Sequence, residues 1–422
     1  MKRFLILTAF VALFGSISCS KTPVEGLDDT QEETVPEVTE QKADGKLQLS
    51  PKSSEMAAMG NSFAFIFLDK VNAAKEGSFV ISPLSMQFLL GMILNGAQGD
   101  TAAEICNVLG YGAGEIEAVN EFSLSMLKQL PKLDELTKLT IANAVAVNQR
   151  YQVKDSFKSS LSKSYEAEIF NLDFGDSQGT SKTINKWCAD HTEGLIPEVL
   201  TADNVIPEMF AFLMNALYFK SPWCYKFKPE DTEPEQFTDS NGNVSTVQMM
   251  KMNKELPFYC KNEIFSSVCL PYGNGTYKMY LFLPEEGMDL PGVIKSLGTK
   301  GLESLHYSRA RVDLWLPRFE TESKIDMNDL LIAMGMPTAF SNSANLEGMS
   351  DVYGTLKLDF IKQMATITVD EEGSEAAAVS VGGFLISSLP PSVSFHANRP
   401  FLYLITEAST SAVLFAGKYS GE

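Results

Sequence analysis

The chain has 422 residues, of which 45% are hydrophobic and 10% aromatic, enough to bury a large core. Thirty-four Lys and Arg against fifty-three Asp and Glu leave a formal charge of −19. This charge argues against nucleic acid, heparin-like polyanions and anionic membrane surfaces as partners, and we find no local basic patch that offsets it.

The N-terminal residues 1–18 have the order of a bacterial export signal. Two basic residues precede a hydrophobic run over residues 4–14, which is too short to span a bilayer, and small residues follow up to Cys19. Residues 16–19 (SISC) resemble a lipobox, in which the cysteine becomes the lipidated first residue, although Ser16 stands where Leu is usual. We expect residues 1–18 to be a signal peptide and Cys19 to carry lipid. The alternative is plain secretion with an incidental cysteine.

An acidic segment follows the signal. Residues 20–44 hold eight acidic residues and two lysines, a net charge of −6, with almost no large apolar side chains. Such a segment cannot bury enough surface to offset its ordering entropy, so we expect residues 19–48 to form a lipidated, flexible tether. Neither a second linker nor an internal repeat interrupts residues 49–422, which predicts one large domain.

Helical patterns dominate the first half of this domain. Apolar residues recur at spacings of three and four between residues 53 and 71. A short strand at residues 79–81 leads into a mostly apolar helix that begins after Ser82-Pro83 and ends near Asn95-Gly96, and a helix that is apolar on all sides is buried. Further helices are expected over residues 102–109, 116–129, 182–191 and 325–334.

Strand patterns dominate the second half. Apolar or alternating runs bounded by Pro, Gly, Asn or charged residues predict strands over residues 139–148, 209–219, 266–272, 277–284, 310–319, 365–370, 401–407 and 411–418. Helices followed by strands predict a mixed α+β protein with mainly antiparallel sheets.

The six cysteines do not form a disulfide framework. Five remain if Cys19 carries lipid, an odd number with irregular spacing and without a CxxC pair. The chain has only three histidines, which argues against a metal site. We expect buried free thiols, with no metal and no cofactor.

Motifs of common hydrolases and nucleotide-binding enzymes are absent from the sequence. It contains no GxSxG, HExxH or GxxxxGK[ST] motif. The glycine cluster at residues 110–114 follows a helical stretch, so it predicts a helix stop and not a phosphate loop. His191 lies near a helix end, and His306 and His396 are expected in loops, where a surface or capping role suits each better than general-base catalysis. We do not expect an enzyme, although motifs alone leave open a triad built from distant residues.

Residues 369–393 (VDEEGSEAAAVSVGGFLISSLPPSV) contain an unusual block of small side chains. In an extended conformation one face would carry Ser374, Ala376, Ala378, Ser380 and Gly382. A strand that enters between two existing strands over a packed core needs small side chains on its inner face, because bulky ones would clash. Gly373 supplies a permissive hinge, and Pro390-Pro391 ends any ladder. Taken alone, the segment favours a flexible surface loop or a weak Ala-rich helix over residues 371–380, and only the rest of the chain shifts the balance toward an inserting strand.

Other stretches place this segment in a wider pattern. They are FVISPLSMQFLLGMILNGAQGDTAAEI, INKWCADHTEGLIPEVL, MNALYFKSPWCYKFKPEDTEPEQF, LWLPRFETESKIDMNDLLIAMGMPTAFSNSANLEGMS and HANRPFLYLITEASTSAVLFAGK. Together with the acid-x-Gly-Ser-Glu-Ala-Ala-Ala sequence at residues 371–378, they resemble in order the landmarks of the serpin family, over residues 53–420.

The resemblance implies a serpin fold with three β-sheets, eight or nine helices and an exposed reactive-centre loop. It implies a hinge formed by Glu371, Glu372, Gly373, Ser374, Glu375, Ala376, Ala377 and Ala378. Seventeen residues counted from Glu371 end at Ser387, so the reactive bond would join Ser387 to Ser388, and Phe384, Leu385 and Ile386 would contribute to specificity.

Positions within the sheet carry over as well. Ser82, Ser85 and Asn215 match the shutter through which the large sheet opens, and Trp223 matches the breach where insertion begins. Gln363 stands where the family usually has His. Because Gln can donate and accept like a neutral imidazole but cannot titrate, we expect the shutter to open without a pH-sensitive switch.

The function implied by the resemblance is suicide inhibition. A protease would cleave the loop, form an acyl-enzyme and be trapped when the loop enters the large sheet as a new strand. The small hinge residues favour an inhibitor over a non-inhibitory serpin-fold binding protein at the cell envelope, which is the alternative. A hydrolase is the third class.

The sequence around the reactive bond limits the target. Residues 384–388 lack Lys and Arg, which disfavours trypsin-like proteases. They suit elastase-, subtilisin- or chymotrypsin-like serine proteases, or papain-like cysteine proteases. We expect a monomer that binds a target serine or cysteine protease and no nucleic acid, and that meets a membrane only through its N-terminal lipid. Export from a bacterial cell and a lipid anchor at the outer membrane or cell surface follow from the signal and tether.

Overall fold

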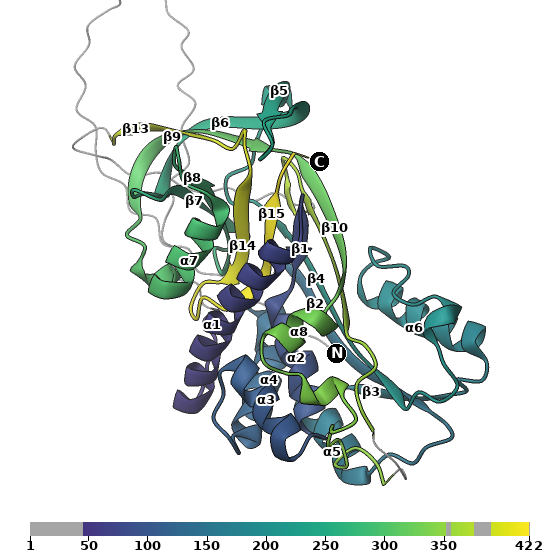
Figure 1. Ribbon diagram of the computed structural model, residues 1–422. Coiled ribbons are helices and arrows are strands. Elements are labelled where there is room, and N and C mark those ends of the chain that lie inside the picture. The colour runs from purple at the N-terminus through teal and green to yellow at the C-terminus, as the bar shows by residue number, and fades with distance from the viewer. Residues whose placement is uncertain (1–44, 352–355, 375–389, 422) are drawn as a thin grey trace, which may run out of the picture.

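The computed structural model describes residues 45–351, 356–374 and 390–421. Within them the chain forms eight α-helices and three hydrogen-bonded sheets, which confirms the expected α+β class and its number of sheets (Figure 1). The helices are α1 (Pro51–Ala74), α2 (Pro83–Leu94), α3 (Gly99–Leu109), α4 (Ile116–Gln129), α5 (Asp155–Ser164), α6 (Ser177–His191), α7 (Leu290–Lys300) and α8 (Asn328–Ala333). Short 3₁₀ helices are η1 (Leu130–Lys132), η2 (Ala202–Asn204), η3 (Pro229–Asp231), η4 (Leu302–Ser304) and η5 (Thr338–Phe340).

The largest sheet has nine strands. Its order is β1 (Phe79–Ile81), β15 (Val413–Tyr419), β14 (Phe401–Glu407), β8 (Tyr277–Pro284), β7 (Phe265–Tyr272), β6 (Val244–Lys261), β9 (Ser308–Pro317) and β13 (Ser392–His396), with β5 (Glu233–Thr238) paired to β6. Among the described strands of this sheet, only β13 runs parallel to its neighbour, and it lies at the sheet edge. This edge strand is the first element after the segment that the sequence identifies as the reactive loop.

Two smaller sheets contain the long strands that matter for function. One has the order β12 (Gly373–Ser374), β4 (Ala211–Pro222), β2 (Lys138–Asn148) and β3 (Glu168–Leu172), and the other pairs β10 (Phe319–Asp326) with β11 (Lys362–Val369). Figure 1 shows α6 on one side of these long strands, with α1 and α2 on the other.

The core follows from the sequence pattern. Helix α2 is buried along its whole length, as its apolar sequence predicts, and it is capped by the Ser82 hydroxyl and started by Pro83. Alternate residues of β4 face two different hydrophobic clusters. Phe212, Met214 and Ala216 pack with α6, whereas Leu217 packs in the main core with α2. The faces of β4 are therefore distinct, and this sets what an added strand would meet.

Several expectations about single elements need correction. The helix expected from residue 325 begins only at Asn328, because Ile325 belongs to β10. The strand expected over residues 310–319 breaks at Pro317, and its two parts enter different sheets. His396 is the last residue of β13 and not a loop residue. Strands β3, β5, β6 and β13 were not predicted, since their partly exposed sequences mix polar and apolar residues without a clear alternation. Helices α5 and α7 were also missed, although the buried apolar residues of α7 recur at helical spacing.

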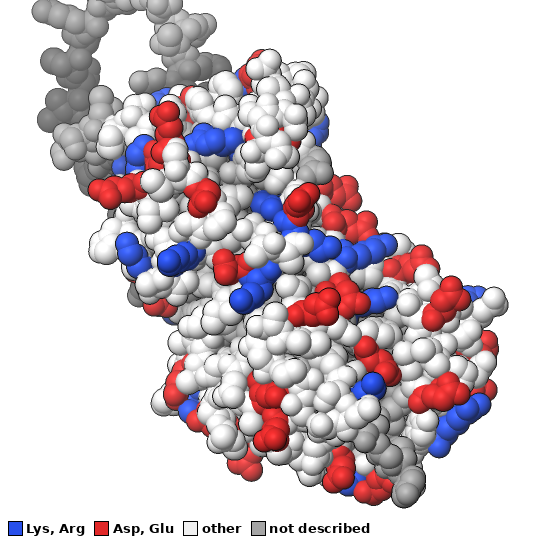
Figure 2. All heavy atoms as spheres, in the orientation of Figure 1, with Lys and Arg blue, Asp and Glu red and all other residues white. Residues whose placement is uncertain are grey.

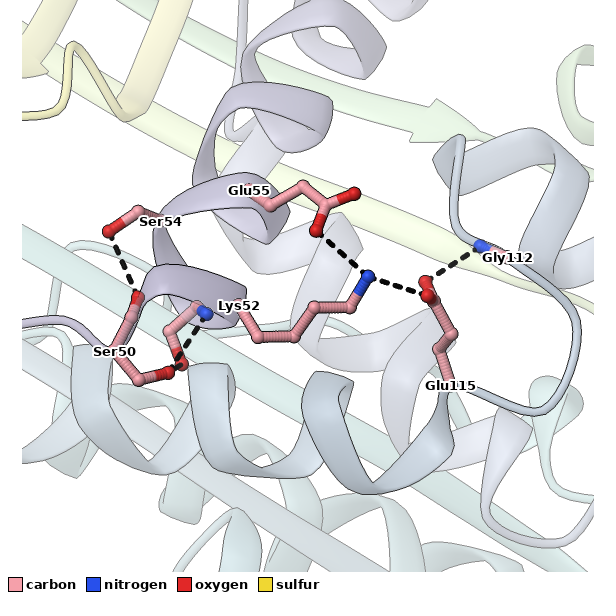
Figure 3. Close-up of polar contacts among 7 residues, drawn as sticks. Ser50, Lys52, Ser54, Glu55, Gly112 and Glu115 are labelled. Atoms are coloured by element: carbon pink, nitrogen blue, oxygen red, sulfur yellow. Dashed lines mark hydrogen bonds and ion pairs between the residues drawn. The ribbon is translucent and has the colours of Figure 1, made fainter.

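Hydrogen bonds and ion pairs fasten the start of the folded body (Figure 3). Ser50 caps α1, because its hydroxyl accepts from the N–H of Ser53 at 3.1 Å. Lys52 forms ion pairs with Glu55 at 2.9 Å and with Glu115 at 2.5 Å, and Glu115 also accepts from the N–H of Gly112 at 2.9 Å. The hydrogen bond to Lys52 lowers the pKa of Glu115, and the same bond raises the pKa of Lys52. Helix α1 is thus tied to the α3–α4 connection where the N-terminal segment joins the body.

Charged residues of both signs are interspersed on the face drawn in Figure 2, without a continuous basic area. Within residues 45–351, 356–374 and 390–421, none of the helices has the length and hydropathy that a membrane crossing requires.

Candidate functional site

A gap separates β4 from β11. Within the described residues, the long neighbour of β4 is β2 and that of β11 is β10. Among the described residues no ladder joins β4 to β11, and only the two residues of β12 pair with the end of β4. Two strand edges therefore face one another with backbone groups that another strand could pair.

The gap contains a cavity of about 150 Å³. Its walls come from α2, α6, β4 and β11, from the connection between α6 and β4 and from residues 356–361 before β11, and they include Ser82, Ser85, Asn215 and Gln363. All four residues that the sequence assigns to the shutter thus line one cavity.

The described part of the hinge, residues 371–374, enters one end of this gap, where Gly373 and Ser374 form strand β12. Gly373 pairs with Pro222 and Ser374 with Ser221, both antiparallel. The carboxylate of Asp370 holds the preceding turn, because Oδ1 accepts from the N–H groups of Glu372 at 2.9 Å and Gly373 at 3.2 Å. The hinge is therefore already docked against β4 at the point where a new strand would start.

Glycine is required at position 373. Its φ is +142°, a region that other residues rarely adopt, and an added Cβ would lie 2.3 Å from the carbonyl oxygen of Ser221. This backbone contact explains why the hinge sequence has Gly at the first paired position.

Gly373→Ala is expected to open the pairing of β12 with β4. The strain and the clash together cost about 2 kcal/mol, so amide hydrogen exchange over residues 371–374 should become at least about tenfold faster. Gly292→Ala in α7, where the added Cβ would meet only the Asp289 side chain at 3.0 Å, is the control. If amide exchange over residues 371–374 were unchanged in the Gly373→Ala variant, the backbone of residue 373 would not be packed closely against the Ser221 carbonyl.

Trp223 lies beside the docked hinge, as expected for the breach. Its indole is 1% exposed, stacks on Tyr272 with ring centroids 4.3 Å apart, and donates through Nε1 to the carbonyl of Asp370 at 2.9 Å. Its backbone N–H donates to the carbonyl of Glu372 at 2.9 Å. Trp223 thus holds the end of β4 against the turn at residues 370–372, which precedes β12.

The two acidic hinge residues have separate anchors. Glu371 is buried, accepts from the Thr232 hydroxyl at 2.6 Å and lies 3.6 Å from Arg318. Glu372 forms an ion pair with Lys226. The N-terminal end of the hinge is therefore a fixed attachment point.

Gln363 joins β11 to the start of α2. Its Oε1 accepts from the backbone N–H of Ser82 at 3.1 Å, and its Nε2 donates to the Ser82 carbonyl at 2.7 Å. The Ser82 hydroxyl donates to the carbonyl of Leu414 in β15 at 2.8 Å and accepts from the N–H of Ser85 at 3.2 Å. The amide therefore uses both its donor and its acceptor, as expected for Gln at this position.

Gln363→Ala is expected to destabilise the protein by about 2 kcal/mol. The Ser82 carbonyl keeps its bond from Met86, so the cost comes mainly from the buried Ser82 N–H, which loses its acceptor. Thermal unfolding measures the loss. Gln363→His should remain stable at pH 8, where a neutral ring can accept from that N–H, and lose stability as the pH falls and the ring is protonated. Equal stability of both variants at all pH values would contradict this role.

Asn215 is not bonded to the other shutter residues. Its Nδ2 donates to Asn143 Oδ1 at 2.8 Å and, at 3.4 Å, to the carbonyl of Ala142, both on β2. Its Oδ1 is closed off from solvent and receives no hydrogen bond from any described residue. An unpaired buried acceptor costs free energy, so a donor placed beside it would be stabilising.

Sequence reasoning missed the side chains that support these residues. Asn143 orients Asn215, and Asp370, Thr232, Arg318 and Lys226 hold the hinge. Only Asp370 has a local signal, since Asp three residues before Gly is typical of a turn. The others come from distant parts of the chain.

Some predicted residues lie outside the described residues. They are Cys19, Glu375, Ala376, Ala377, Ala378, Phe384, Leu385, Ile386, Ser387 and Ser388. Their roles stay predictions.

The other residues that the sequence singled out are the cysteines, the glycine cluster and possible metal ligands. Cys106, Cys188, Cys224, Cys260 and Cys269 are free, and all but the half-buried Cys224 are buried. Burial raises the pKa of Cys188, Cys224 and Cys269 to about 12, so these thiols are protonated and weakly nucleophilic. Gly110 ends α3 in a left-handed conformation, which confirms the expected helix stop. The part of the chain that the structure describes contains no cluster of His, Cys, Asp and Glu suited to a metal ion.

The similarity to known proteins covers nearly the whole folded domain. The sequence model described as "Serpin (serine protease inhibitor)" matches residues 58–421. Serpin B6 of Macaca fascicularis is 32% identical over 378 residues, which are 86% of this chain and 99% of that protein. The leukocyte elastase inhibitor of Xenopus tropicalis is 32% identical and covers 85% of this chain and 97% of its own length.

The fold agrees with solved structures. The native thermophilic serpin tengpin superposes with a TM-score of 0.77 at 27% identity, covering 90% of this chain and 96% of tengpin. The family description and the relative from Xenopus tropicalis both name inhibitors and not catalysts, so this chain is not an enzyme. It belongs to the serpin family of serine protease inhibitors.

Proposed function

We propose that this serpin traps a protease by inserting its cleaved reactive loop into the gap between β4 and β11. The protease nucleophile attacks the carbonyl carbon of Ser387, the bond to Ser388 breaks, and the Ser388 amine leaves with a proton. Ser387 stays joined to the protease as an acyl-enzyme. The freed loop then continues β12 along β4 and carries the protease with it. This proposal uses strand addition to an exposed sheet edge, for which serpin loop insertion is a known example.

The observation that carries the proposal is the register of β12 on β4. Gly373 pairs with Pro222 and Ser374 with Ser221. Continued one residue at a time, this register pairs Ser380 with Asn215 and Phe384 with Ala211, the first residue of β4. The loop would therefore fill the length of β4.

The register also matches side chains to the faces of β4. Ala376 and Ala378 would lie beside Phe219 and Leu217, which pack in the main core, so small side chains are needed there. Ser380 would bring a hydroxyl donor to Asn215, whose Oδ1 has none among the described residues. On the opposite face Glu375 would lie beside Lys220, an opposite-charge pair across the strands.

The energies are of the right size. Fourteen residues from Ser374 to Ser387, at about 3.3 Å each, would move the acyl-enzyme by roughly 45 Å. About ten new ladder hydrogen bonds at ~1 kcal/mol net each would contribute on the order of 10 kcal/mol. This is comparable with the stability of a whole domain, so the new strand could distort the trapped protease.

The proposed targets are elastase-, subtilisin- or chymotrypsin-like serine proteases, or papain-like cysteine proteases. The support is the apolar and small sequence Phe384-Leu385-Ile386-Ser387-Ser388 and the absence of Lys and Arg from it. The similarity to a leukocyte elastase inhibitor is consistent with this choice. A monomer requires no partner other than the protease.

We further propose that the protein is exported and anchored by lipid on Cys19, at the outer membrane or cell surface. The support is the export signal, the SISC sequence and the acidic segment over residues 20–44. Ser20 after Cys19 fits sorting to the outer membrane. Mass spectrometry of the mature N-terminus tests the lipid, and an unmodified Cys19 would contradict it.

Incubation with pancreatic elastase tests the inhibitory function. We expect a stoichiometric complex that survives denaturing electrophoresis, and a released C-terminal fragment that begins at Ser388. Cleavage without a complex would support a non-inhibitory serpin. Multiple turnover of a substrate by the serpin itself would contradict its assignment as a non-enzyme.

A further inference from the structure

Three side chains join the C-terminal end of α6 to the edge strand β3. We call Glu168, Trp187 and His191 the α6 anchor. Trp187 Nε1 donates to Glu168 Oε1 at 3.0 Å, and the rings of Trp187 and His191 lie 4.5 Å apart. His191 Nδ1 lies 2.8 Å from the carbonyl oxygen of Trp187, and its Nε2 lies 3.5 Å from Glu168 Oε1.

The geometry fixes the tautomer of His191. A carbonyl oxygen only accepts, so Nδ1 must carry the hydrogen that it donates to Trp187. A neutral imidazole has a single N–H, and Nε2 therefore presents a lone pair toward the Glu168 carboxylate. Protonation adds a hydrogen at Nε2 and converts this contact into an ion pair. Histidine is the side chain that ordinarily changes charge between pH 5 and 8.

The other charges around this end of α6 are mostly paired with one another. Lys186 pairs with Asp190 at 2.5 Å, and Lys138 of β2 pairs with Glu193 at 2.6 Å. Lys138 lowers the pKa of Glu193 by hydrogen bonding, with a smaller contribution from Lys220 of β4. The further charged groups on the elements that pack against α6 are Lys182 of α6 itself and Asp203 of η2. Glu168 is the charged group that contacts the His191 ring.

Helix α6 covers the gap between β4 and β11. Ile184 and Cys188 of α6 line the cavity between β4 and β11, and so do Thr192, Ile196 and Leu200 of the connection to β4. A cavity of about 150 Å³ does not hold the side chains of a whole strand, so α6 and this connection must lift when a strand enters. The α6 anchor joins α6 to β3, which is the strand farthest from the gap in its sheet. This contact therefore opposes the lifting of α6.

We infer that the α6 anchor is a pH-sensitive brake on loop insertion, an inference that rests on the proposed function. When His191 is protonated at acidic pH, it pairs with Glu168, α6 is held more firmly on β3, and the loop enters more slowly. The shutter itself does not titrate, because Gln363 occupies the position that bonds Ser82. The pH response therefore belongs to α6.

Tryptophan fluorescence tests the anchor without any protease. An imidazolium in contact with an indole quenches its emission, so the signal of Trp187 should fall as the pH is lowered from 8 to 5. Trp315 also stacks on a histidine, His396, at 4.2 Å, and His396→Gln is therefore the background for this titration. His191→Gln in that background should abolish the change. A titration that is identical with and without His191 would overturn the anchor.

Inhibition stoichiometry at pH 5.5 and 7.5 tests the brake. Loop insertion yields the covalent complex, whereas hydrolysis of the acyl-enzyme before insertion yields free cleaved serpin. The ratio of complex to cleaved serpin therefore compares the rate of insertion with the rate of deacylation. Comparing variants at each pH cancels the protease's own pH dependence. Glu168→Gln keeps an acceptor for Trp187 but removes the charge, and His191→Gln removes the titrating ring.

For this exposed ion pair we expect the complex-to-cleaved ratio to be about threefold lower in the wild type than in either variant at pH 5.5, and equal at pH 7.5. Equal ratios at both pH values would overturn the brake. If cleavage gives no complex at any pH, the proposed function fails, whereas the fluorescence titration still decides whether the anchor exists.

Discussion

Cleavage between Ser387 and Ser388 is expected to raise the unfolding temperature of this serpin by on the order of 20 °C. The reason is the gap between β4 and β11, whose strand edges have no ladder partner beyond β12 among the described residues. A strand that pairs with both edges adds on the order of 10 kcal/mol from its ladder hydrogen bonds. Scanning calorimetry of intact and cleaved protein at one scan rate measures the shift.

A nicked loop that does not insert gives the opposite result. Chain cleavage without new contacts leaves the body unchanged or slightly less stable, since it only adds freedom to the cut ends. An unfolding temperature that is equal or lower after cleavage would therefore contradict insertion. Serpin cleaved within the acidic segment over residues 20–44 is the control, because that cut lies outside the reactive loop.

Ala378→Arg is expected to abolish complex formation and convert the serpin into a substrate. If the loop continues the register of β12 as proposed, residue 378 would lie beside Leu217, which is 8% exposed and belongs to the main core. An arginine there would bury a charge without a partner, at a cost of several kcal/mol that exceeds the gain from the neighbouring ladder bonds. Insertion would stall at this residue, and deacylation would release active protease.

Ala378→Ser is the matched control for this substitution. It keeps a small side chain at the same position, so this variant should form most of the covalent complex that the wild type forms. Denaturing electrophoresis with elastase measures both variants against the wild type. Full complex formation by the arginine variant would mean that residue 378 does not enter the core face of the sheet.

The fold was largely predictable from local sequence. Helix α2 and strands β7, β14 and β15 have mostly apolar sequences, which fits the burial of all their residues. Elements with one exposed face were harder. β6 alternates irregularly over 18 residues and pairs with three different strands, so it has no single period.

The candidate site was predictable only in part. The row of small residues after Gly373 is a local signal, and the family resemblance located Ser82, Gln363, Asn215 and Trp223. Sequence could not show that Asn215 Oδ1 has no donor among the described residues, because that depends on Asn143 from another strand. The anchors of Glu371 and Glu372 likewise come from side chains more than fifty residues away.

The most direct test of the central claim is a crystal structure of the serpin cleaved after Ser387. We predict a strand between β4 and β11 in the register set by Gly373 with Pro222, with the Ser380 hydroxyl beside Asn215 Oδ1. Residue 384 should then lie opposite Ala211. A cleaved structure in which residues 375–387 lie outside the sheet and the gap is unfilled would contradict the proposed mechanism.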